Sequence, residues 1–402
     1  MTTPPLPPPP PPPPAPPPPP GPMRRRGPRP LLLHLMLARQ SPGSKSGWPS
    51  WNAGWPGLTA PLGTLPADLI GADPALAAGI AAYRRHPWQR DTPDPPVLWQ
   101  EGGSRLLSYA ESGPPLLLVP SLINRAHVLD MLPGRSLVRW LAGQGIRPLL
   151  LDWGWPGTLE RGFNLTDYVA GRLERALGAV GAPCTLLGYC MGGLLALAAA
   201  LRRPDRVRAL ALLATPWDFH AGDAGLARGV APGLAQLLPA MEPAMAATGT
   251  MPVDALQTLF TLADGGAAAA RYRGFAGMAQ DSDRARMFVA LEDWLNDGVP
   301  LPAPVARECL GGWYGANSPA RGEWRVAGEP VQPAALAMPS FVALPARDRL
   351  VPPASARALA DALPGATLHQ AAGGHIGMVV GSAAEAGLWQ PLLGWLRSAA
   401  GG

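Results

Sequence analysis

The sequence predicts an α/β protein in which a mostly parallel sheet is interrupted by a helical insertion. From about residue 67 onward, short apolar segments alternate with longer segments of helical pattern, which is typical of βαβ units. Residues from about 216 to 330 break this alternation, because they lack clear strand patterns and are rich in Ala, Gly and Met. We expect this insertion to cover the carboxyl edge of the sheet, where ligands bind in such folds.

Each element of the predicted sheet rests on an apolar run that is followed by turn residues or by a helical repeat. The predicted strands are residues 116–119, 148–151, 184–187, 207–213, 340–344 and 366–370. The predicted helices are residues 135–144, 165–180, 191–201, 354–363 and 380–398. The helix at 165–180 has Asn164 or Thr166 as its N-cap, since either side chain can accept a hydrogen bond from the first turn.

The N-terminal residues differ in composition, and we expect a proline-rich, disordered arm over residues 1–66 ahead of a domain at residues 67–402. Residues 4–22 are almost entirely proline, which favours polyproline II or disorder, and they either dock a proline-binding partner or form a plain tail. Residues 24–38 place arginines ahead of an apolar run, as in a signal peptide, but the run is short and His34 interrupts it.

Charge and cysteine content exclude several classes of protein. Six of the 33 basic residues lie in residues 1–50, which contain no acid, so 27 basic residues face 28 acids in residues 51–402. This near-neutral body lacks the basic excess that nucleic-acid binding requires. The sequence contains no run of 18 apolar residues, so it predicts no membrane-spanning helix. The cysteines, Cys184, Cys190 and Cys309, have neither disulfide nor metal-ligand spacing, which favours a reducing, cytoplasmic location.

The most specific motif is Gly188-Tyr189-Cys190-Met191-Gly192, which lies between a predicted strand and a predicted helix. This is the context of the nucleophile elbow G-x-S-x-G, with Cys at the Ser position. The elbow is a tight, strained turn that needs small neighbours, and it presents the nucleophile at a helix N-terminus, which favours a thiolate. The alternative is a buried structural cysteine whose glycines serve helix–sheet packing.

A thiol nucleophile needs a base and a group that orients the base. In hydrolases with this elbow the acid follows a late strand, and the histidine lies in a loop before the last helix. Asp348 follows the strand at 340–344, and His375 lies in a glycine-rich loop after the strand at 366–370. The alternatives are a helix-capping carboxylate for Asp348 and an ordinary loop histidine for His375. The order Cys190, Asp348, His375 predicts an α/β-hydrolase fold with these three catalytic residues.

The loop after the first predicted parallel strand supplies the second oxyanion donor in such folds. We therefore expect the backbone N–H of Met191 and one N–H from residues 121–123, for which we take Leu122, to bind the oxyanion. Asp130, Arg135 and Asp152 lie near this loop in the sequence, and we interpret them as structural. Trp217 and Phe219 either line the acyl site or pack beneath the insertion.

These motifs, and the segments around them, resemble the catalytic subunit of polyhydroxyalkanoate synthases, closest in style to the class III type. Further matching segments are residues 119–125, 135–141, 151–154 and 214–216, and the resemblance spans roughly residues 95–398. It implies an α/β-hydrolase core with a cap, a Cys190–His375–Asp348 site, 3-hydroxyacyl-CoA as the substrate and no cofactor. It also implies a cytoplasmic enzyme that associates with polymer granules and works as a homodimer or with a second synthase subunit.

The thiol itself favours acyl transfer, because attack on a CoA thioester exchanges one thioester for another and keeps the acyl group activated. One alternative is a Cys-dependent acyl-CoA thioesterase or polyester hydrolase that uses the same three residues with water as the acceptor. Another is a catalytically silent granule protein whose basic, proline-rich arm makes the contacts.

Overall fold

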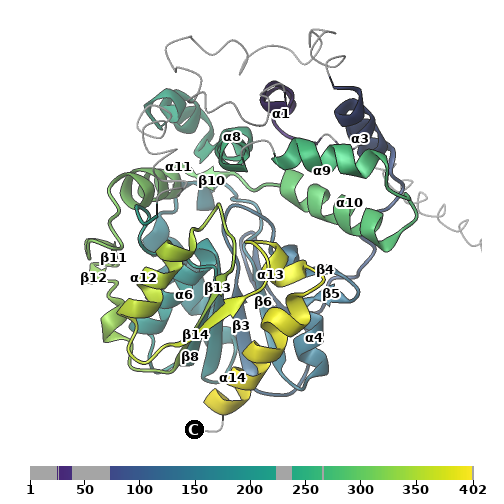
Figure 1. Ribbon diagram of the computed structural model, residues 1–402. Coiled ribbons are helices and arrows are strands. Elements are labelled where there is room, and N and C mark those ends of the chain that lie inside the picture. The colour runs from purple at the N-terminus through teal and green to yellow at the C-terminus, as the bar shows by residue number, and fades with distance from the viewer. Residues whose placement is uncertain (1–24, 26, 39–72, 223–237, 265–266, 401–402) are drawn as a thin grey trace, which may run out of the picture.

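A computed structural model of the chain describes residues 25, 27–38, 73–222, 238–264 and 267–400. Its centre is an eight-stranded sheet with the order β1-β2-β6-β3-β7-β8-β13-β14 (Figure 1). The strands are β1 (Val97–Glu101), β2 (Ser104–Ser108), β3 (Pro115–Val119), β6 (Arg147–Asp152), β7 (Cys184–Tyr189), β8 (Val207–Leu213), β13 (Ser340–Pro345) and β14 (Thr367–Ala371). The six strands from β6 to β14 in this order are mutually parallel, which confirms the predicted fold class.

The antiparallel hairpin β1–β2 was not predicted. Its strands are five residues each, and they are joined by Gly102 and Gly103, a two-glycine turn in which Gly102 has φ 56°. A glycine pair between two short apolar runs is a hairpin signal. The hairpin extends the sheet through antiparallel pairing of β2 with β6.

Helices cover both faces of the sheet, and they are mostly those predicted. The core helices are α4 (Leu137–Gly143), α5 (Glu174–Ala179), α6 (Met191–Arg202), α12 (Pro353–Ala362), α13 (Gly377–Val380) and α14 (Gln390–Ala400), with the π-helical segments η3 (Asp167–Leu173) and η6 (Glu385–Trp389). The helix predicted at 135–144 begins at Leu137, because the two residues before it form the short strand β5 (Arg135–Ser136). The helix predicted at 380–398 is divided into α13, η6 and α14.

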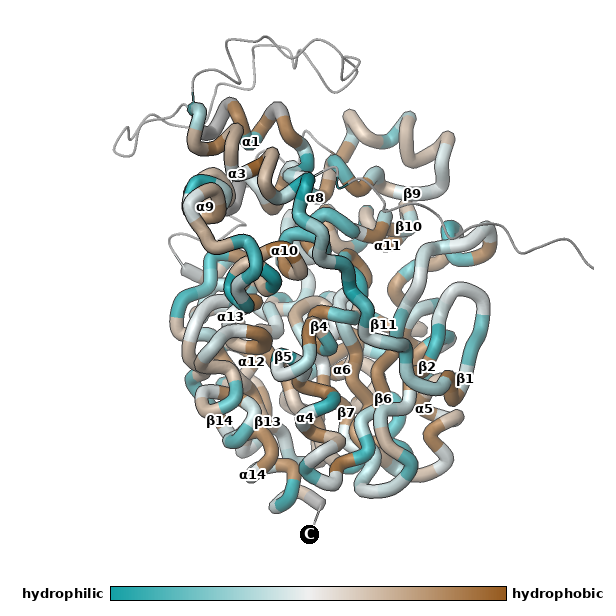
Figure 2. The backbone as a smooth tube through the Cα atoms, turned by 90° about the vertical axis from the view of Figure 1, so that its right-hand side faces the viewer, coloured by the Kyte–Doolittle hydropathy of each residue, from teal (hydrophilic) through white to brown (hydrophobic). Residues whose placement is uncertain are grey.

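The side chains of the parallel strands alternate between two apolar layers. Leu117, Leu149 and Leu186 pack with α6 and α12 on one face, whereas Leu116 and Leu150 pack with α4 and α14 on the other. These central strands are the brown interior in Figure 2. Asn164 caps the helical segment that follows it, since its Oδ1 accepts a hydrogen bond from the Asp167 N–H (3.0 Å).

Between β8 and β13, a set of helices lies above the carboxyl edge of the sheet, as we expected for the insertion (Figure 1). These are α8 (Val253–Asp264), α9 (Ala267–Ala276), α10 (Asp283–Asn296), α11 (Ala303–Arg307) and the π-helical segment η4 (Glu308–Gly315). Two short two-stranded ladders accompany them, β9 (Thr250–Met251) with β10 (Leu301–Pro302), and β11 (Arg325–Val326) with β12 (Glu329–Pro330). We call α8, α9 and α10 the cap.

The N-terminal part of the chain also joins the cap, which corrects one prediction. Residues 1–66 were expected to be disordered, yet residues 31–38 form helix α1 (Leu31–Ala38), with Leu35 buried against the cap. Helix α3 (Pro74–Arg85) packs along α9. The correction has a physical cause: the apolar run buries Leu35 in a cluster whose other members lie far away in the sequence. The proline tract at 4–22 and the segment at 40–66 lie outside the described residues.

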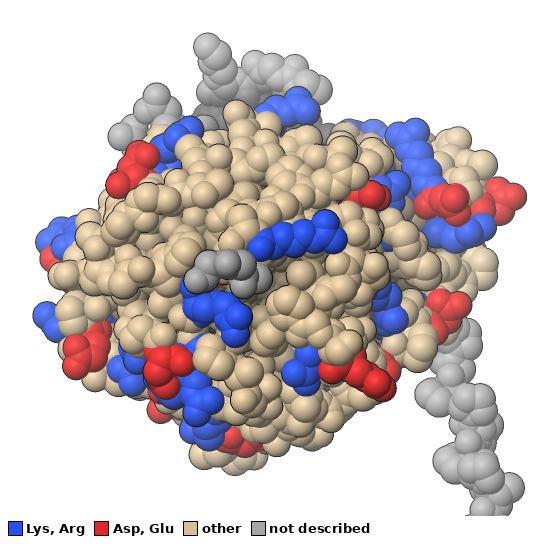
Figure 3. All heavy atoms as spheres, turned by 90° about the horizontal axis from the view of Figure 1, so that it is seen from below, with Lys and Arg blue, Asp and Glu red and all other residues tan. Residues whose placement is uncertain are grey.

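The surface opposite the cap carries both signs of charge. Figure 3 shows arginines interspersed with acidic side chains on this face. Arginines of the chain commonly form ion pairs, for example Arg203 with Asp205 (2.8 Å) and Arg202 with Glu174 (2.7 Å). Within the described residues, no helix has the length and apolar character that crossing a membrane requires.

Candidate active site

Cys190 occupies a strained turn between β7 and α6. Its backbone has φ 55° and ψ −129°, a region that residues with a side chain rarely adopt. The neighbouring glycines make the turn possible. A Cβ on Gly188 would lie 2.3 Å from the Cα of Gly193, and one on Gly192 would lie 2.1 Å from the Val119 carbonyl oxygen. The sequence motif therefore has the strand–turn–helix geometry of a nucleophile elbow.

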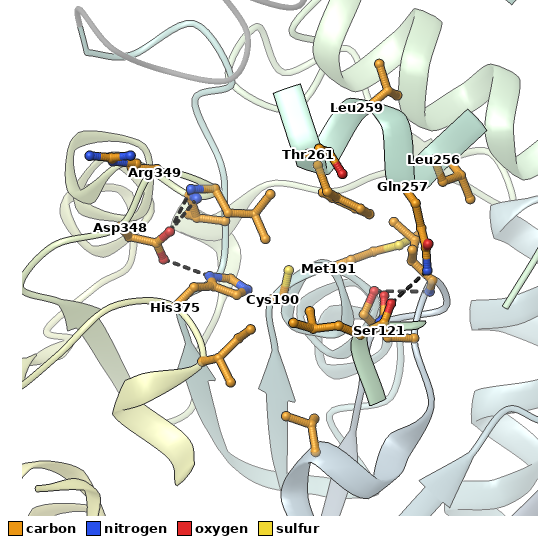
Figure 4. Close-up of a pocket in the computed structure, with 18 of the residues that line it drawn as sticks. Ser121, Cys190, Met191, Leu256, Gln257, Leu259, Thr261, Asp348, Arg349 and His375 are labelled. Atoms are coloured by element: carbon orange, nitrogen blue, oxygen red, sulfur yellow. Dashed lines mark hydrogen bonds and ion pairs between the residues drawn. The ribbon is translucent and has the colours of Figure 1, made fainter. Parts of the chain in front are cut away.

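Asp348 and His375 are brought together from two loops at the same sheet edge. Asp348 follows β13 and His375 follows β14, and the distance from His375 Nδ1 to Asp348 Oδ2 is 2.7 Å (Figure 4). The Asp348 side chain is fully buried, and its other oxygen accepts hydrogen bonds from the N–H groups of Leu350 (2.8 Å) and Val351 (2.9 Å). The carboxylate is therefore held in one orientation, with one oxygen directed at the imidazole.

Cys190 faces the same imidazole from the other side (Figure 4). Burial alone would lower the pKa of His375, but the negative charges of Cys190 and Asp348 and their hydrogen bonds outweigh it and raise this pKa to about 10. The His375 side chain is only 11% exposed, so solvent screens these interactions little. The raised pKa makes His375 a strong base, placed between Cys190 and the Asp348 carboxylate.

A cavity of about 910 Å³ opens over these groups, which is at the upper end of the range of roughly 300–1,000 Å³ for small-molecule sites. Cys190 and His375 lie at its floor, on the sheet side. The lining includes apolar side chains such as Phe219, Leu310 and Trp313, and it also includes the arginines on either side of Asp348 in the sequence. Cap residues such as Leu259 and Thr261 lie above Met191 in Figure 4. The site is therefore a thiol–imidazole pair in a largely apolar pocket under the cap.

Comparison with known proteins agrees with the fold. The family model described as alpha/beta hydrolase fold matches residues 160–382. A solved structure, that of DcsB in complex with its substrate analogue, aligns with a TM-score of 0.50 and 16% identity over 74% of this chain and 95% of that chain. At this identity the structural match shows the fold alone.

Sequence relatives decide the family. The chain is 30% identical over 292 residues to the Poly(3-hydroxyalkanoate) polymerase subunit PhaC of Synechocystis sp., covering 70% of this chain and 77% of the relative. The chain belongs to the PhaC family. It is also 30% identical over 312 residues to PhaC of Haloferax mediterranei, of which it spans 63%, and 29% identical over 291 residues to PhaC of Allochromatium vinosum, of which it spans 80%. The resemblance seen in the sequence motifs is confirmed.

One residue that contacts the candidate triad of this PhaC chain was missed by the sequence argument. Tyr189 precedes the nucleophile, and its hydroxyl donates a hydrogen bond to the His375 backbone oxygen (3.1 Å). Its ring lies against the imidazole, with 5.3 Å between ring centroids. Tyr189 is buried, so both contacts are shielded from solvent. The motif left this position open as "x", and only the fold brings it to the histidine loop.

The oxyanion donors stay a prediction. Met191 begins α6, and the approach of Gly192 to the carbonyl oxygens of Val119 and Pro120 brings the loop after β3 against this helix. The loop lines the cavity through Pro120 and its next neighbours, whereas the Leu122 side chain is buried in the core. The proposed role needs only the backbone N–H of Leu122, so the burial of its side chain does not conflict with it.

The charged residues near this loop are held by hydrogen bonds and ion pairs, in keeping with their structural interpretation. Asp130 is buried and accepts hydrogen bonds from Arg139 Nε (2.7 Å) and from three other side chains. Burial opposes ionisation of Asp130, but these donors hold its pKa below the usual range. Asp152 pairs with Arg105 (2.9 Å), and Arg135 donates to a backbone carbonyl (2.9 Å).

The remaining candidates separate into core and cavity. Trp217 packs in the core, whereas Phe219 lines the cavity. All three cysteines are free: Cys184 is a core residue, and Cys309 is buried in the cavity wall, where burial raises its pKa well above the ordinary value. No cluster of three or more His, Cys, Asp or Glu side chains suited to a metal ion occurs within the described residues.

Proposed function

We propose that this chain polymerises 3-hydroxyacyl groups from CoA thioesters through an acyl thioester on Cys190. The observation that carries the proposal is a cysteine at the elbow, adjacent to the buried His375–Asp348 pair, in a chain of the PhaC family. PhaC relatives are named as subunits of Poly(3-hydroxyalkanoate) polymerases, and we extend that activity to this chain.

In the first half-reaction, the Cys190 thiolate attacks the thioester carbonyl carbon. The bond between that carbon and the CoA sulfur breaks, and CoA leaves with the proton from the His375 imidazolium. Asp348 keeps the imidazole oriented and stabilises its charged form. The N–H groups of Met191 and Leu122 are assigned to the negative oxygen of the tetrahedral intermediate.

In the second half-reaction, a 3-hydroxyl group attacks the acyl–Cys190 thioester. His375, now neutral, takes the hydroxyl proton, a new ester bond forms, and the Cys190 thiolate is released with the imidazolium restored. A positioned base of this kind contributes roughly 10²–10⁴-fold to the rate. The apolar wall around the thiol limits the access of water, which otherwise competes with the hydroxyl.

The enzyme's surroundings follow from the same family assignment. Because the relatives are named as subunits of a polymerase, we propose that the chain works with a second synthase subunit or a second copy of itself. Since the product is a water-insoluble polyester, we place the working enzyme at the surface of a polymer granule in the cytoplasm.

The test is an assay of the purified protein with 3-hydroxybutyryl-CoA that follows CoA release and identifies the acyl product. Ester-linked polymer that is lost in Cys190→Ala but kept in Cys309→Ala is the expected result. Cys309 is the matched control, because it is a second thiol in the wall of the same cavity. Free 3-hydroxybutyrate as the only product would instead assign a thioesterase or polyester hydrolase. Granule binding without CoA release, unchanged in Cys190→Ala, would assign a silent granule protein.

A further inference from the structure

The N-terminal segment made of residue 25 and residues 27–38, which we call the strap, is anchored to the cap by specific contacts. The Arg25 side chain is 11% exposed and forms an ion pair with Asp293 of α10 (2.7 Å). Arg25 also donates to the backbone oxygens of His86 and Trp88, and it lies over the Tyr83 ring. A buried, multiply bonded arginine of this kind belongs to a built structure rather than to a solvated tail.

Two more contacts hold the strap further along. The Gly27 carbonyl oxygen accepts a hydrogen bond from Arg84 Nε (3.0 Å), and a Cβ on Gly27 would lie 2.3 Å from Asn296 of α10. Leu35 is buried in an apolar cluster of the cap that contains Tyr272 of α9. Figures 1 and 2 both place α1 on the cap, on the side of α8 and α9 that faces away from the sheet.

The strap lines the same cavity as Cys190. Pro28, Arg29 and His34 belong to the cavity wall, together with Cys190 and His375 at the floor. The chain segment that supplies this wall lies more than 150 residues before the nucleophile in the sequence. The cavity therefore extends from the thiol at the sheet edge to the strap in the cap.

The two ends of the cavity differ in chemistry. The lining near Cys190 includes the aromatic rings of Phe219 and Tyr314, which suit an acyl chain, beside the charged loop that contains Asp348. The strap end is polar: Arg29 pairs with Asp254 of α8 (3.0 Å, with Arg29 37% exposed), and the buried His34 lies 3.4 Å from the Thr261 hydroxyl. This end suits the part of an acyl-CoA beyond the thioester, with its amides and phosphates.

Charge in the sequence favours the same assignment. Residues 1–50 carry six basic residues and no acid, whereas the rest of the chain is almost neutral. An acyl-CoA carries several negative phosphate charges, and arginine is the side chain best suited to phosphate groups.

We propose that the strap forms the CoA-binding end of the cavity, with Arg29 and His34 in contact with the phosphate- and amide-bearing part of the donor. This inference rests on the proposed function for its ligand. Arg25 does not line the cavity, so it acts as a positioning residue that holds the strap in place.

The experiment compares two donors that differ only in the part assigned to the strap: 3-hydroxybutyryl-CoA and the 3-hydroxybutyryl thioester of N-acetylcysteamine. We expect Arg29→Ala to raise KM for the CoA thioester about three- to tenfold, because a charged hydrogen bond at a partly exposed site is lost. KM for the truncated thioester should be unchanged. Arg25→Ala should show the same selectivity, and added salt should reduce the difference between wild type and Arg29→Ala.

Arg273→Ala is the matched control. Arg273 lies on α9, is exposed like Arg29 and forms an ion pair with Asp73 (2.6 Å), but it does not line the cavity. It should leave KM for both donors unchanged. Calorimetry can measure the binding of free CoA to the full-length Cys190→Ala protein. Adding Arg29→Ala to this protein should weaken CoA binding, whereas adding Arg273→Ala should not.

The outcomes separate this inference from the proposed function. CoA binding that depends on Arg29, without ester polymer from any acyl-CoA, supports the strap and overturns the polymerase proposal. Polymer synthesis in which Arg29→Ala leaves CoA affinity and the ratio of the two KM values unchanged overturns the strap proposal. Loss of granule binding in Arg29→Ala with unchanged CoA affinity also overturns it, and assigns the basic residues to the granule surface.

Discussion

Replacing Asp348 with Asn changes one group in the pair with His375, and we expect it to remove most of the acyl transfer while the protein stays folded. The Asn oxygen can still accept the hydrogen bonds from the N–H groups of Leu350 and Val351. The Asn NH₂ group then faces His375 Nδ1, where the carboxylate oxygen was at 2.7 Å. It donates to Nδ1, so the ring hydrogen moves to Nε2, which faces Cys190. This tautomer cannot accept the thiol proton.

The magnitude follows from two losses. The hydrogen bond between a carboxylate and an imidazolium contributes about 1.5–3 kcal/mol, which corresponds to roughly 10–150-fold in rate. Loss of the general base removes about 10²–10⁴-fold. Both losses act on the same proton, so they do not add, and we expect CoA release to fall by about 10²–10⁴-fold.

The assay is single-turnover CoA release from 3-hydroxybutyryl-CoA, with thermal unfolding measured on the same protein. Asp361→Asn is the matched control, because Asp361 is an exposed aspartate on α12 that does not line the cavity. Asp348→Asn that releases CoA at the wild-type rate would refute the assignment of Asp348 to His375. A stability loss well beyond the about 1.5–3 kcal/mol of the lost hydrogen bond would contradict the expectation that the loop bonds survive.

Three further predictions concern the same sheet edge. Tyr189→Phe loses the hydrogen bond to the His375 carbonyl but keeps the ring. Alkylation of Cys190 by iodoacetamide should therefore slow about 2–12-fold, and the dependence of its rate on pH should change. An unchanged pH dependence would assign Tyr189 to packing alone. Cys190→Gly should be about 1–3 kcal/mol more stable than Cys190→Ala in urea unfolding, because φ 55° strains any residue with a Cβ; equal stabilities would show that the elbow is unstrained. The Asp130 pKa is lowered, so its contribution to stability is present above about pH 4 and is lost as the pH falls through the folded-state pKa. Asp130→Asn should therefore be less stable than wild type at pH 7 and should lose less stability in acid, and parallel unfolding curves from pH 7 to 3 would contradict this.

Most of the parallel strands were predictable because they are apolar runs of four to seven residues that are buried on both faces; the edge strand β14, which is largely exposed, is the exception. β7 is an example: all six of its residues are buried, and its sequence shows no alternation. The run is local, and a glycine-rich turn follows it at once. The hairpin β1–β2 was harder to predict, since β1 is largely exposed and has no apolar face to reveal it.

The structure of the strap could not be derived from the sequence, because its partners are far away along the chain. Arg25 and Asp293 are 268 residues apart, and neither has a local pattern that points to the other. Six basic residues without an acid predict a solvated tail as long as only neighbours are considered. The apolar residues beside them were a usable signal, since Leu35 needs a buried surface and the cap provides one.

The candidate site shows the same division between local and distant information. Cys190, Asp348 and His375 were predictable because each lies in a turn whose sequence is characteristic and whose order along the chain is typical of one fold. Tyr189 and the cavity wall were not, because their roles depend on which loop the β-sheet places opposite them. A residue's chemistry is thus visible in the motif, whereas its partners emerge only from the topology.

Three features of the site act together in the proposed acyl transfer. They are the strain at Cys190, the aromatic lining near the thiol and the polar strap end of the cavity. Strain at Cys190 fixes the sulfur in front of His375, so little ordering is left to the reaction itself. In the proposed reaction the acyl chain is assigned to the aromatic lining near the thiol, which limits the access of water to the thioester, while the strap assigned to CoA lies at the opposite end of the cavity. On this arrangement CoA leaves towards the cap, and the incoming hydroxyl finds an acyl group that is still activated. A serine at the elbow would keep the geometry but lose that activation, which is why the thiol is the residue that favours ester-bond formation over hydrolysis.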